Sequence, residues 1–335
     1  MFLQDNAGGF QIFADYPTAN AYKICVGDFN HDGLTDVAGI GWSSGQVDVF
    51  PQRLDGTLLF SAQFTANYGG YNDLKSGDVN GDGLADIVVM SGQSYAIPNL
   101  GVLLQTNGGF APVSYYGIGP NQLTTGMGIG DVNGDGRNDI VVSYGGNRPY
   151  ARIGVFLQQP SGMLSLGSTN ASYDIPEPVV IADVDLDGRQ DVVTLHGGWQ
   201  RLGIYFQTSL GSLATEQLYS IPYASDYNLN GLAIGDVNGD GMPDAVIADY
   251  NHGLVVLTNR PAPPAFQIRS INITPDGKIS LSIPYRGGKD TCTVQASDNP
   301  AGTNWAAIGL VTGASWIDTN SPSGQPGRFY RLLAK

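Results

Sequence analysis

Short runs of apolar residues, many of them β-branched, alternate along most of this chain with stretches rich in Gly, Asn and Asp. Runs such as residues 86–90 (DIVVM) and 139–143 (DIVVS) are typical of buried strands. After a variable loop, each is followed by a second apolar run that ends in Gln, as in residues 101–105 (GVLLQ) and 154–158 (GVFLQ). A turn containing Gly and a further strand come next. The pattern predicts an all-β protein of short antiparallel strands.

This strand pattern repeats together with an acidic loop of nine residues. The five copies, loops 1 to 5, begin at residues 28, 78, 131, 183 and 236, so their starts lie 50, 53, 52 and 53 residues apart. Self-similarity at such a period is the mark of a repeat architecture. Four strands within each period correspond to one propeller blade. We therefore predict a five-bladed β-propeller with four-stranded blades over residues 1–259.

The two ends of the repeat region predict how the ring closes. The last repeat ends at its third strand, residues 253–258, whereas residues 10–15 resemble a fourth strand. We expect residues 10–15 to complete the last blade and residues 1–4 to remain as a surplus third-strand copy. Residues 260–265 (RPAPPA) form a stiff Pro-rich linker. Residues 266–335 alternate as strands and predict a small β-sandwich.

The acidic loop has the ligand spacing of a calcium site. Ca²⁺ binds six to eight oxygens, mostly from carboxylates and carbonyls. Positions one, three, five and nine carry Asp or Asn, position seven supplies its backbone carbonyl, and Gly at position six permits the sharp turn. The predicted ligands of five Ca²⁺ ions are Asp28, Asn30, Asp32, Leu34 and Asp36; Asp78, Asn80, Asp82, Leu84 and Asp86; Asp131, Asn133, Asp135, Arg137 and Asp139; Asp183, Asp185, Asp187, Arg189 and Asp191; and Asp236, Asn238, Asp240, Met242 and Asp244.

The loops differ from EF-hands, which need a bidentate Glu at position twelve and flanking helices. Position twelve here is Gly39, Val89, Val142, Thr194 or Ile247, and the flanks are strands. One such loop alone would also fit a solvated turn. Five in register favour cation binding, as does charge: the net charge is −14, and 16 of the 30 acidic residues lie in the loops, so five Ca²⁺ would leave −4.

Composition excludes several classes of protein. A hydrophobic fraction of 42% argues against disorder, and net acidity argues against nucleic-acid binding. No apolar run is long enough for a transmembrane helix, and the first five residues are not a signal peptide. Cys25 and Cys292 fall in different predicted domains. Two free thiols and an inter-domain disulfide both fit this placement.

The sequence offers no credible catalytic set. It has only two Glu, and we expect Glu177 in a loop and Glu216 on an outer strand, pointing away from the ring centre. His196 is expected in a loop without a nucleophile nearby. The loops between second and third strands instead carry aromatic residues, of which Trp42 and Trp199 do not follow the repeat. These two tryptophans are the predicted ligand face, suited to a sugar ring or a protein groove.

The motif D-x-N-x-D-G-x-x-D, followed by an apolar strand and a Gly-Phe turn, resembles the FG-GAP/VCBS repeats of calcium-binding propellers such as that of integrin α-subunits. Phe10 and Phe110 match the Gly-Phe element, and Leu58, Leu164 and Leu213 depart from it. The resemblance implies an extracellular location, calcium as a rigidifying element, and a role in binding, adhesion or scaffolding. The C-terminal residues resemble a small Ig-like or fibronectin-like sandwich of secreted bacterial proteins.

These features predict a non-enzymatic, secreted or surface-attached, calcium-stabilised propeller that serves as an adhesion, binding or surface-structural module. Its partner would be a protein or glycan at the cell surface. One alternative is a subunit of a head-to-tail filament of identical copies, joined through the terminal strand and the C-terminal sandwich. The other is a carbohydrate-binding lectin or a polysaccharide-degrading enzyme.

Overall fold

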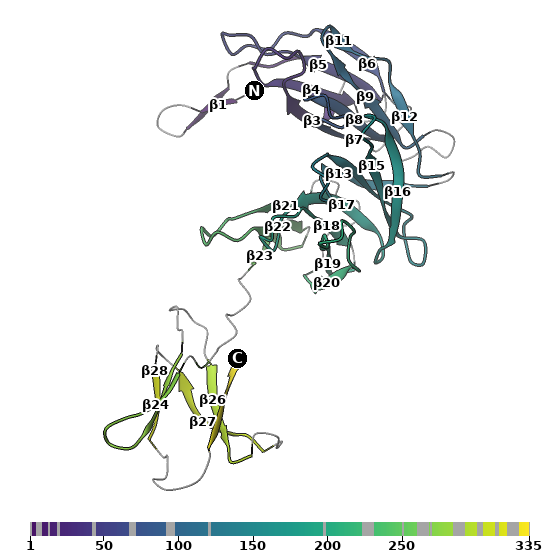
Figure 1. Ribbon diagram of the computed structural model, residues 1–335. Coiled ribbons are helices and arrows are strands. Elements are labelled where there is room, and N and C mark those ends of the chain that lie inside the picture. Colours follow the sequence, from purple (N-terminus) through teal and green to yellow (C-terminus); the bar gives the residue numbers. More distant parts are fainter. Residues whose placement is uncertain are drawn as a thin grey trace. The chain divides into compact units, whose positions relative to one another are not determined.

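The computed structural model (Figure 1) forms two compact units, Met1–Asn259 and Arg260–Lys335. The residues that the structure describes are 2–4, 9–12, 14–18, 21–41, 45–66, 72–91, 98–119, 122–196, 199–222, 231–249, 251–259, 268, 270–283, 292–299, 304–311, 315–319 and 328–334. The predicted linker at 260–265 lies outside them. Within the described part, no helix is long and apolar enough to cross a membrane.

The first unit is a series of antiparallel sheets, each made from strands that follow one another in the sequence. Blade 1 contains β3 (Ala21–Gly27), β4 (Asp36–Gly41), β5 (Gln46–Phe50) and β6 (Ala62–Thr65); blade 2 contains β7 (Asn72–Gly77), β8 (Asp86–Ser91), β9 (Leu100–Leu103) and β12 (Ser114–Tyr116); blade 3 contains β13 (Thr124–Gly130), β14 (Asp139–Tyr144), β15 (Arg152–Gln158) and β16 (Leu164–Ala171); blade 4 contains β17 (Pro176–Ala182), β18 (Asp191–His196), β19 (Arg201–Tyr205) and β20 (Gln217–Ser220); and blade 5 contains β21 (Leu232–Gly235), β22 (Asp244–Asp249) and β23 (Gly253–Leu257). Blade 2 also carries the short hairpin of β10 (Gln105–Thr106) and β11 (Gly109–Phe110).

Apolar cores lie between consecutive blades. Leu74 of blade 2 packs with Ile40 and Val47 of blade 1, and equivalent clusters join blades 2 and 3, 3 and 4, and 4 and 5. The first strands of consecutive blades contact one another, β3 with β7, β7 with β13, β13 with β17 and β17 with β21. Sheets that pack face to face with adjoining first strands are propeller-like, which confirms the all-β prediction and its four-stranded unit. The number of blades stays a prediction.

The N-terminal strands differ from the expectation for ring closure. β1 (Phe2–Gln4) pairs with β2 (Phe10–Ile12), and β23 pairs with β22 alone among the described strands. The prediction that residues 10–15 complete the last blade is therefore wrong for this structure. A hairpin between neighbouring segments closes only a short loop, which costs less chain entropy than joining segments from opposite ends of the repeat region.

The second unit contains two three-stranded sheets. One has β24 (Ser270–Ile273), β25 (Ile279–Ser282) and β28 (Ser315–Asp318), and the other has β26 (Cys292–Ser297), β27 (Ala306–Val311) and β29 (Phe329–Ala334). Their shared core includes Leu281, Cys292 and Val311. The assignment as an Ig-like sandwich stays a prediction. Cys25 and Cys292 are both free thiols.

Candidate metal centre

Each acidic loop joins the first and second strands of its blade, as loop 1 does between β3 and β4. Gly at position six has a positive φ throughout, for example 83° at Gly33 and 87° at Gly188. Position four also has a positive φ even where it is not Gly, 60° at His31 and 59° at Leu186. Residues other than Gly rarely adopt a positive φ. Its occurrence at the same two positions of every loop shows that the five loops share one conformation. That conformation brings the side chains of positions one, three and five together.

The aspartate at position nine clamps the loop to the third strand of the same blade. Asp86 is fully buried, and its two carboxylate oxygens accept the N–H groups of Val79 at 2.9 Å and Gln105 at 2.8 Å. The matching pairs of donors, one from position two and one from the end of the third strand, contact Asp36, Asp139, Asp191 and Asp244. The last ligand position is therefore preorganised by backbone donors.

Burial, with neighbouring carboxylates, raises the pKa of the position-nine aspartates in loops 1 to 4. Burial, reinforced by Asp82 and Asp78, raises the pKa of Asp86 to about 6, and burial with Asp135 nearby raises the pKa of Asp139 to about 6. At position one the opposite holds for Asp236, because the N–H of Gly241 lowers its pKa. A loop of this kind gathers negative charge around a buried carboxylate, and a bound cation would relieve the repulsion.

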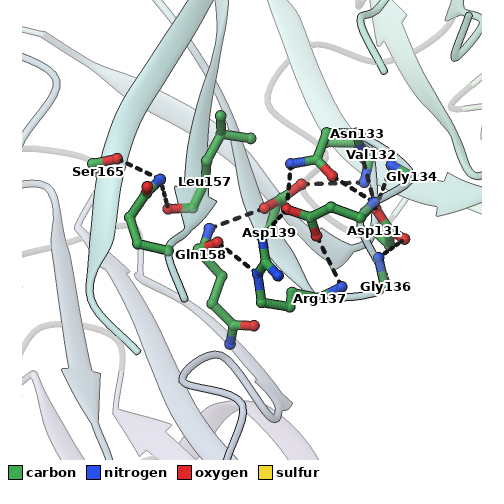
Figure 2. Close-up of polar contacts among 12 residues, drawn as sticks. Asp131, Val132, Asn133, Gly134, Gly136, Arg137, Asp139, Leu157, Gln158 and Ser165 are labelled. Carbon is green, nitrogen blue, oxygen red and sulfur yellow. Dashed lines mark hydrogen bonds and ion pairs between the residues drawn. The ribbon is translucent and has the colours of Figure 1, made fainter. Parts of the chain in front are cut away.

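The oxygens of positions one, three and five lie close together. In loop 4 the carboxylates of Asp183, Asp185 and Asp187 have oxygens within 4.8 Å of one another. In loop 3, shown in Figure 2, Asn133 stands where loop 4 has Asp185, and its amide donates to Asp135 at 3.1 Å. A set of carboxylate, amide and carbonyl oxygens is the ligand chemistry of Ca²⁺. The loops fit the predicted ion.

Two arginines in these loops make contacts that the sequence analysis did not anticipate. Arg137 and Arg189 occupy position seven, for which the sequence predicts only a backbone carbonyl ligand. Their guanidinium groups pair with Asp135 and Asp187, the carboxylates at position five. The Nε of Arg137 also donates to the carbonyl of Gln158 at 3.0 Å, as Figure 2 shows. Loops 3 and 4 thus carry partial internal charge compensation, which loops 1, 2 and 5 lack at position seven.

The predicted ligand face is described in part. Trp199 lies between β18 and β19 and is 45% exposed, whereas Trp42 lies outside the described residues. Tyr150, between β14 and β15, is 73% exposed. The guanidinium of Arg148 stacks over the Tyr173 ring at 4.2 Å. Because consecutive antiparallel connections alternate between the two edges of a sheet, these residues lie on the edge opposite the acidic loops.

The expectations for His196 and Glu216 are wrong. His196 ends β18 and is fully buried, and its Nε2 lies 2.8 Å from Oε1 of Glu216. Its Nδ1 lies 3.0 Å from the carbonyl oxygen of Asp174, and the N–H of Tyr173 donates to Glu216 at 2.7 Å. Glu216 precedes β20 and turns inward because Gly203, with no side chain, leaves room beside His196. Every polar atom of this pair has a structural partner, so the pair stabilises blade 4.

Comparison with known proteins supports this picture. The family model described as FG-GAP-like repeat matches residues 28–89, 78–142 and 183–247, which include all five loops and more than half of the chain. Integrin alpha-V of Gallus gallus is 26% identical over 228 residues, 59% of this chain and 21% of the integrin. Integrin alpha-IIb of Homo sapiens is 27% identical over 215 residues, 55% of this chain and 20% of the integrin. The chain thus spans about a fifth of the length of these relatives.

Among solved structures, a lectin from Agrocybe aegerita is similar in fold. It was described for its recognition of non-reducing terminal N-acetylglucosamine. The TM-score is 0.52 and the sequence identity 17%, over 99% of this chain and 92% of the lectin. At this identity the likeness concerns the fold alone.

Proposed function

The chain belongs to the FG-GAP-like repeat family, and on this premise we propose that it is a non-enzymatic, calcium-stabilised module for binding or adhesion outside the cell. Its similarity to integrin alpha chains supports a binding role and an extracellular setting. The buried His196–Glu216 pair argues against catalysis by those two residues, since both are used in packing.

Calcium is proposed to bind in all five loops, through the side chains of positions one, three, five and nine and the carbonyl of position seven. Extracellular calcium modules of this kind bind with a Kd of roughly 10⁻⁴–10⁻³ M. Such sites fill at the calcium concentrations outside cells. The ion would neutralise the clustered carboxylates and hold the first and second strands of each blade in register.

The observation that carries the binding role is the exposed aromatic face on the edge opposite these loops. We define it as Tyr150, Tyr173 and Trp199 together with Arg148. Two of its aromatic side chains are 73% and 45% exposed. The N–H of Arg148 donates to Asp174 at 2.5 Å, so the loop of blade 3 is fixed against the start of blade 4. A rigid aromatic and guanidinium surface suits a sugar ring or a protein groove.

Screening the purified chain in calcium against glycans and cell-surface proteins tests this role. Replacement of Tyr150 and Trp199 by Ala is expected to weaken binding at least about tenfold, as loss of aromatic anchors does at other interfaces. Leu210→Ala is the matched control, because Leu210 is 91% exposed in the turn between β19 and β20, on the loop edge. Equal binding by all three proteins would exclude the aromatic face as the binding surface.

A head-to-tail assembly of copies is the second candidate, and the exposure of two repeat positions favours it. The first position lies four residues before the start of each loop. Its side chain is only 1% to 8% exposed in blades 2 to 5, whereas Ile24, the equivalent residue of blade 1, is 66% exposed. At loop position two the side chain is 1% to 6% exposed in blades 1 to 4, but Val237 of blade 5 is 55% exposed. Blade 1 and blade 5 therefore present the two complementary halves of an inter-blade interface.

Solution size measured by light scattering and negative-stain microscopy in calcium tests this assembly. If blade 5 of one copy covers blade 1 of the next, oligomers should grow with concentration, and Ile24→Asp or Val237→Asp should return the chain to monomers. A wild-type monomer that loses stability on either substitution would instead indicate that the two faces meet within one chain.

A further inference from the structure

A carboxamide side chain stands at the end of the third strand or two residues beyond it in every blade. These residues, the strand-end amides, are Gln52, Gln105, Gln158, Gln207 and Asn259. Each donates its backbone N–H to the position-nine aspartate of its own loop, at 2.7, 2.8, 3.0, 2.9 and 2.8 Å respectively. The backbone of each amide residue is therefore fixed relative to its own loop, which determines where its side chain can reach.

In blades 4 and 5 the side chain reaches the loop of the preceding blade. The Nε2 of Gln207 donates to the carbonyl of Asp131 in loop 3 at 2.9 Å, and the Nδ2 of Asn259 donates to the carbonyl of Val184 in loop 4 at 2.5 Å. Gln190 of blade 4 also accepts the N–H of Asp131 at 2.7 Å. Both backbone groups of Asp131, the first predicted ligand of loop 3, are thus held by the next blade.

In blade 3 the amide of Gln158 occupies the same place but is not satisfied. Gln158 and Gln207 approach equivalent glycines of the preceding loops. A Cβ added to Gly81 of loop 2 would lie 3.7 Å from Oε1 of Gln158, and one added to Gly134 of loop 3 would lie 3.5 Å from Oε1 of Gln207. Gly81 and Gly134 are both position four, between two ligand positions. Yet both amide atoms of Gln158 lack a hydrogen-bond partner within the described part of the chain, although the residue is 1% exposed. Figure 2 shows this amide extending away from loop 3.

A buried amide without partners is costly and calls for a group that satisfies it. The carbonyl oxygen of Asp78, at the first ligand position of loop 2, does not bond to Gln158. It accepts a hydrogen bond from Nδ2 of Asn138 at 3.1 Å. Gln105 repeats the situation in blade 2, since it is 1% exposed and both of its amide atoms are unpartnered among the described residues.

We propose that the strand-end amides of blades 3 to 5, Gln158, Gln207 and Asn259, are positioning residues for the calcium site of the preceding blade, so that cation binding in one loop is coupled to docking of the next blade. The inference rests on the proposed calcium loading of the loops. Each amide acts through the loop that it contacts: Gln207 holds Asp131 in place for the ion in loop 3. Gln158 lies against loop 2, where an ion-loaded loop would supply the partner that its amide lacks.

Calorimetric calcium titration of the full chain tests the coupling. Gln207→Leu is expected to weaken one of the sites about tenfold or more, as loss of residues behind metal ligands commonly does. Gln217→Leu is the control, because it makes the same chemical change on the exposed strand β20 of the same blade. In an Asp135→Ala background, which removes the loop 3 site, Gln207→Leu should weaken no remaining site.

Gln158→Leu gives a second readout that packing alone would not produce. Because its amide has no partner to lose, the variant should melt no lower than wild type in chelator, yet bind calcium more weakly at one site. If both leucine variants leave every calcium affinity unchanged, or lower the melting temperature equally in calcium and in chelator, the amides serve only inter-blade packing and the coupling is wrong. If wild type binds no calcium at millimolar concentration, the proposed function itself fails.

Discussion

Removal of calcium is expected to unfold or greatly loosen the first unit. A site at 10 to 100 times its Kd adds about 1.4 to 2.7 kcal/mol to the free energy of unfolding. Five independent sites in about 10 mM calcium would therefore contribute roughly 7 to 14 kcal/mol. That sum is comparable to the whole stability of an ordinary domain, which is about 5–15 kcal/mol. Without the ion, each loop retains three or four carboxylates in close proximity.

Thermal melts followed by circular dichroism in calcium and in excess chelator measure this effect. The second unit is an internal control, because residues 266–335 carry no acidic loop and their transition should not move. Magnesium at the same concentration should restore less stability than calcium, since it demands near-ideal octahedral geometry. If the melting temperature of the first unit were the same in chelator as in calcium, the calcium assignment would be contradicted.

Substitution of Asp86 by Ala is expected to destabilise the protein even without calcium. The carboxylate is fully buried and accepts the N–H groups of Val79 and Gln105. Its loss leaves two buried donors unpaired, at about 1–3 kcal/mol each. We therefore expect the free energy of unfolding to fall by about 2–6 kcal/mol in chelator. In calcium the variant should lose the loop 2 site as well.

Asp82→Ala is the matched control for this substitution. Asp82 is another predicted ligand of loop 2, but it is exposed to solvent. Its carboxylate accepts a hydrogen bond from the N–H of Leu84 at 2.9 Å. Water can replace that acceptor, so the chelated variant should remain within about 1 kcal/mol of wild type. Urea unfolding of both variants, with and without calcium, separates the two roles. Equal stability of the two variants in chelator would show that position nine acts only as a ligand.

The repeat, the all-β class and the shared conformation of the acidic loops could be predicted from the sequence because each depends on local spacing. Alternation places strand residues on one face or the other, and the Asp-x-Asn-x-Asp-Gly pattern converges within nine residues. The position-nine aspartates were predicted as ligands. Their second role, as acceptors for the end of the third strand, joins residues such as Asp139 and Gln158 that lie far apart in the repeat.

Several features depend instead on which segments pack together. The carboxamide at or just beyond the end of the third strand is Gln in four blades and Asn in the fifth, which is a pattern in the sequence, but only the packing of blade 4 against blade 3 brings Gln207 to Asp131. The pair of His196 and Glu216 forms because the segment before β20 passes beside the end of β18, where His196 is fully buried.

The sequence by itself thus determined the repeating strand unit and the acidic loops, since hydrophobic alternation and the spacing of Asp, Asn and Gly act over a few residues. The tertiary structure decided the pairing of β1 with β2, the exposure of Ile24 and Val237, and the contacts of Gln207 and Asn259 with the loop of the preceding blade. These outcomes depend on which segments pack against one another, and similar repeats carry no local signal that tells one neighbour from another.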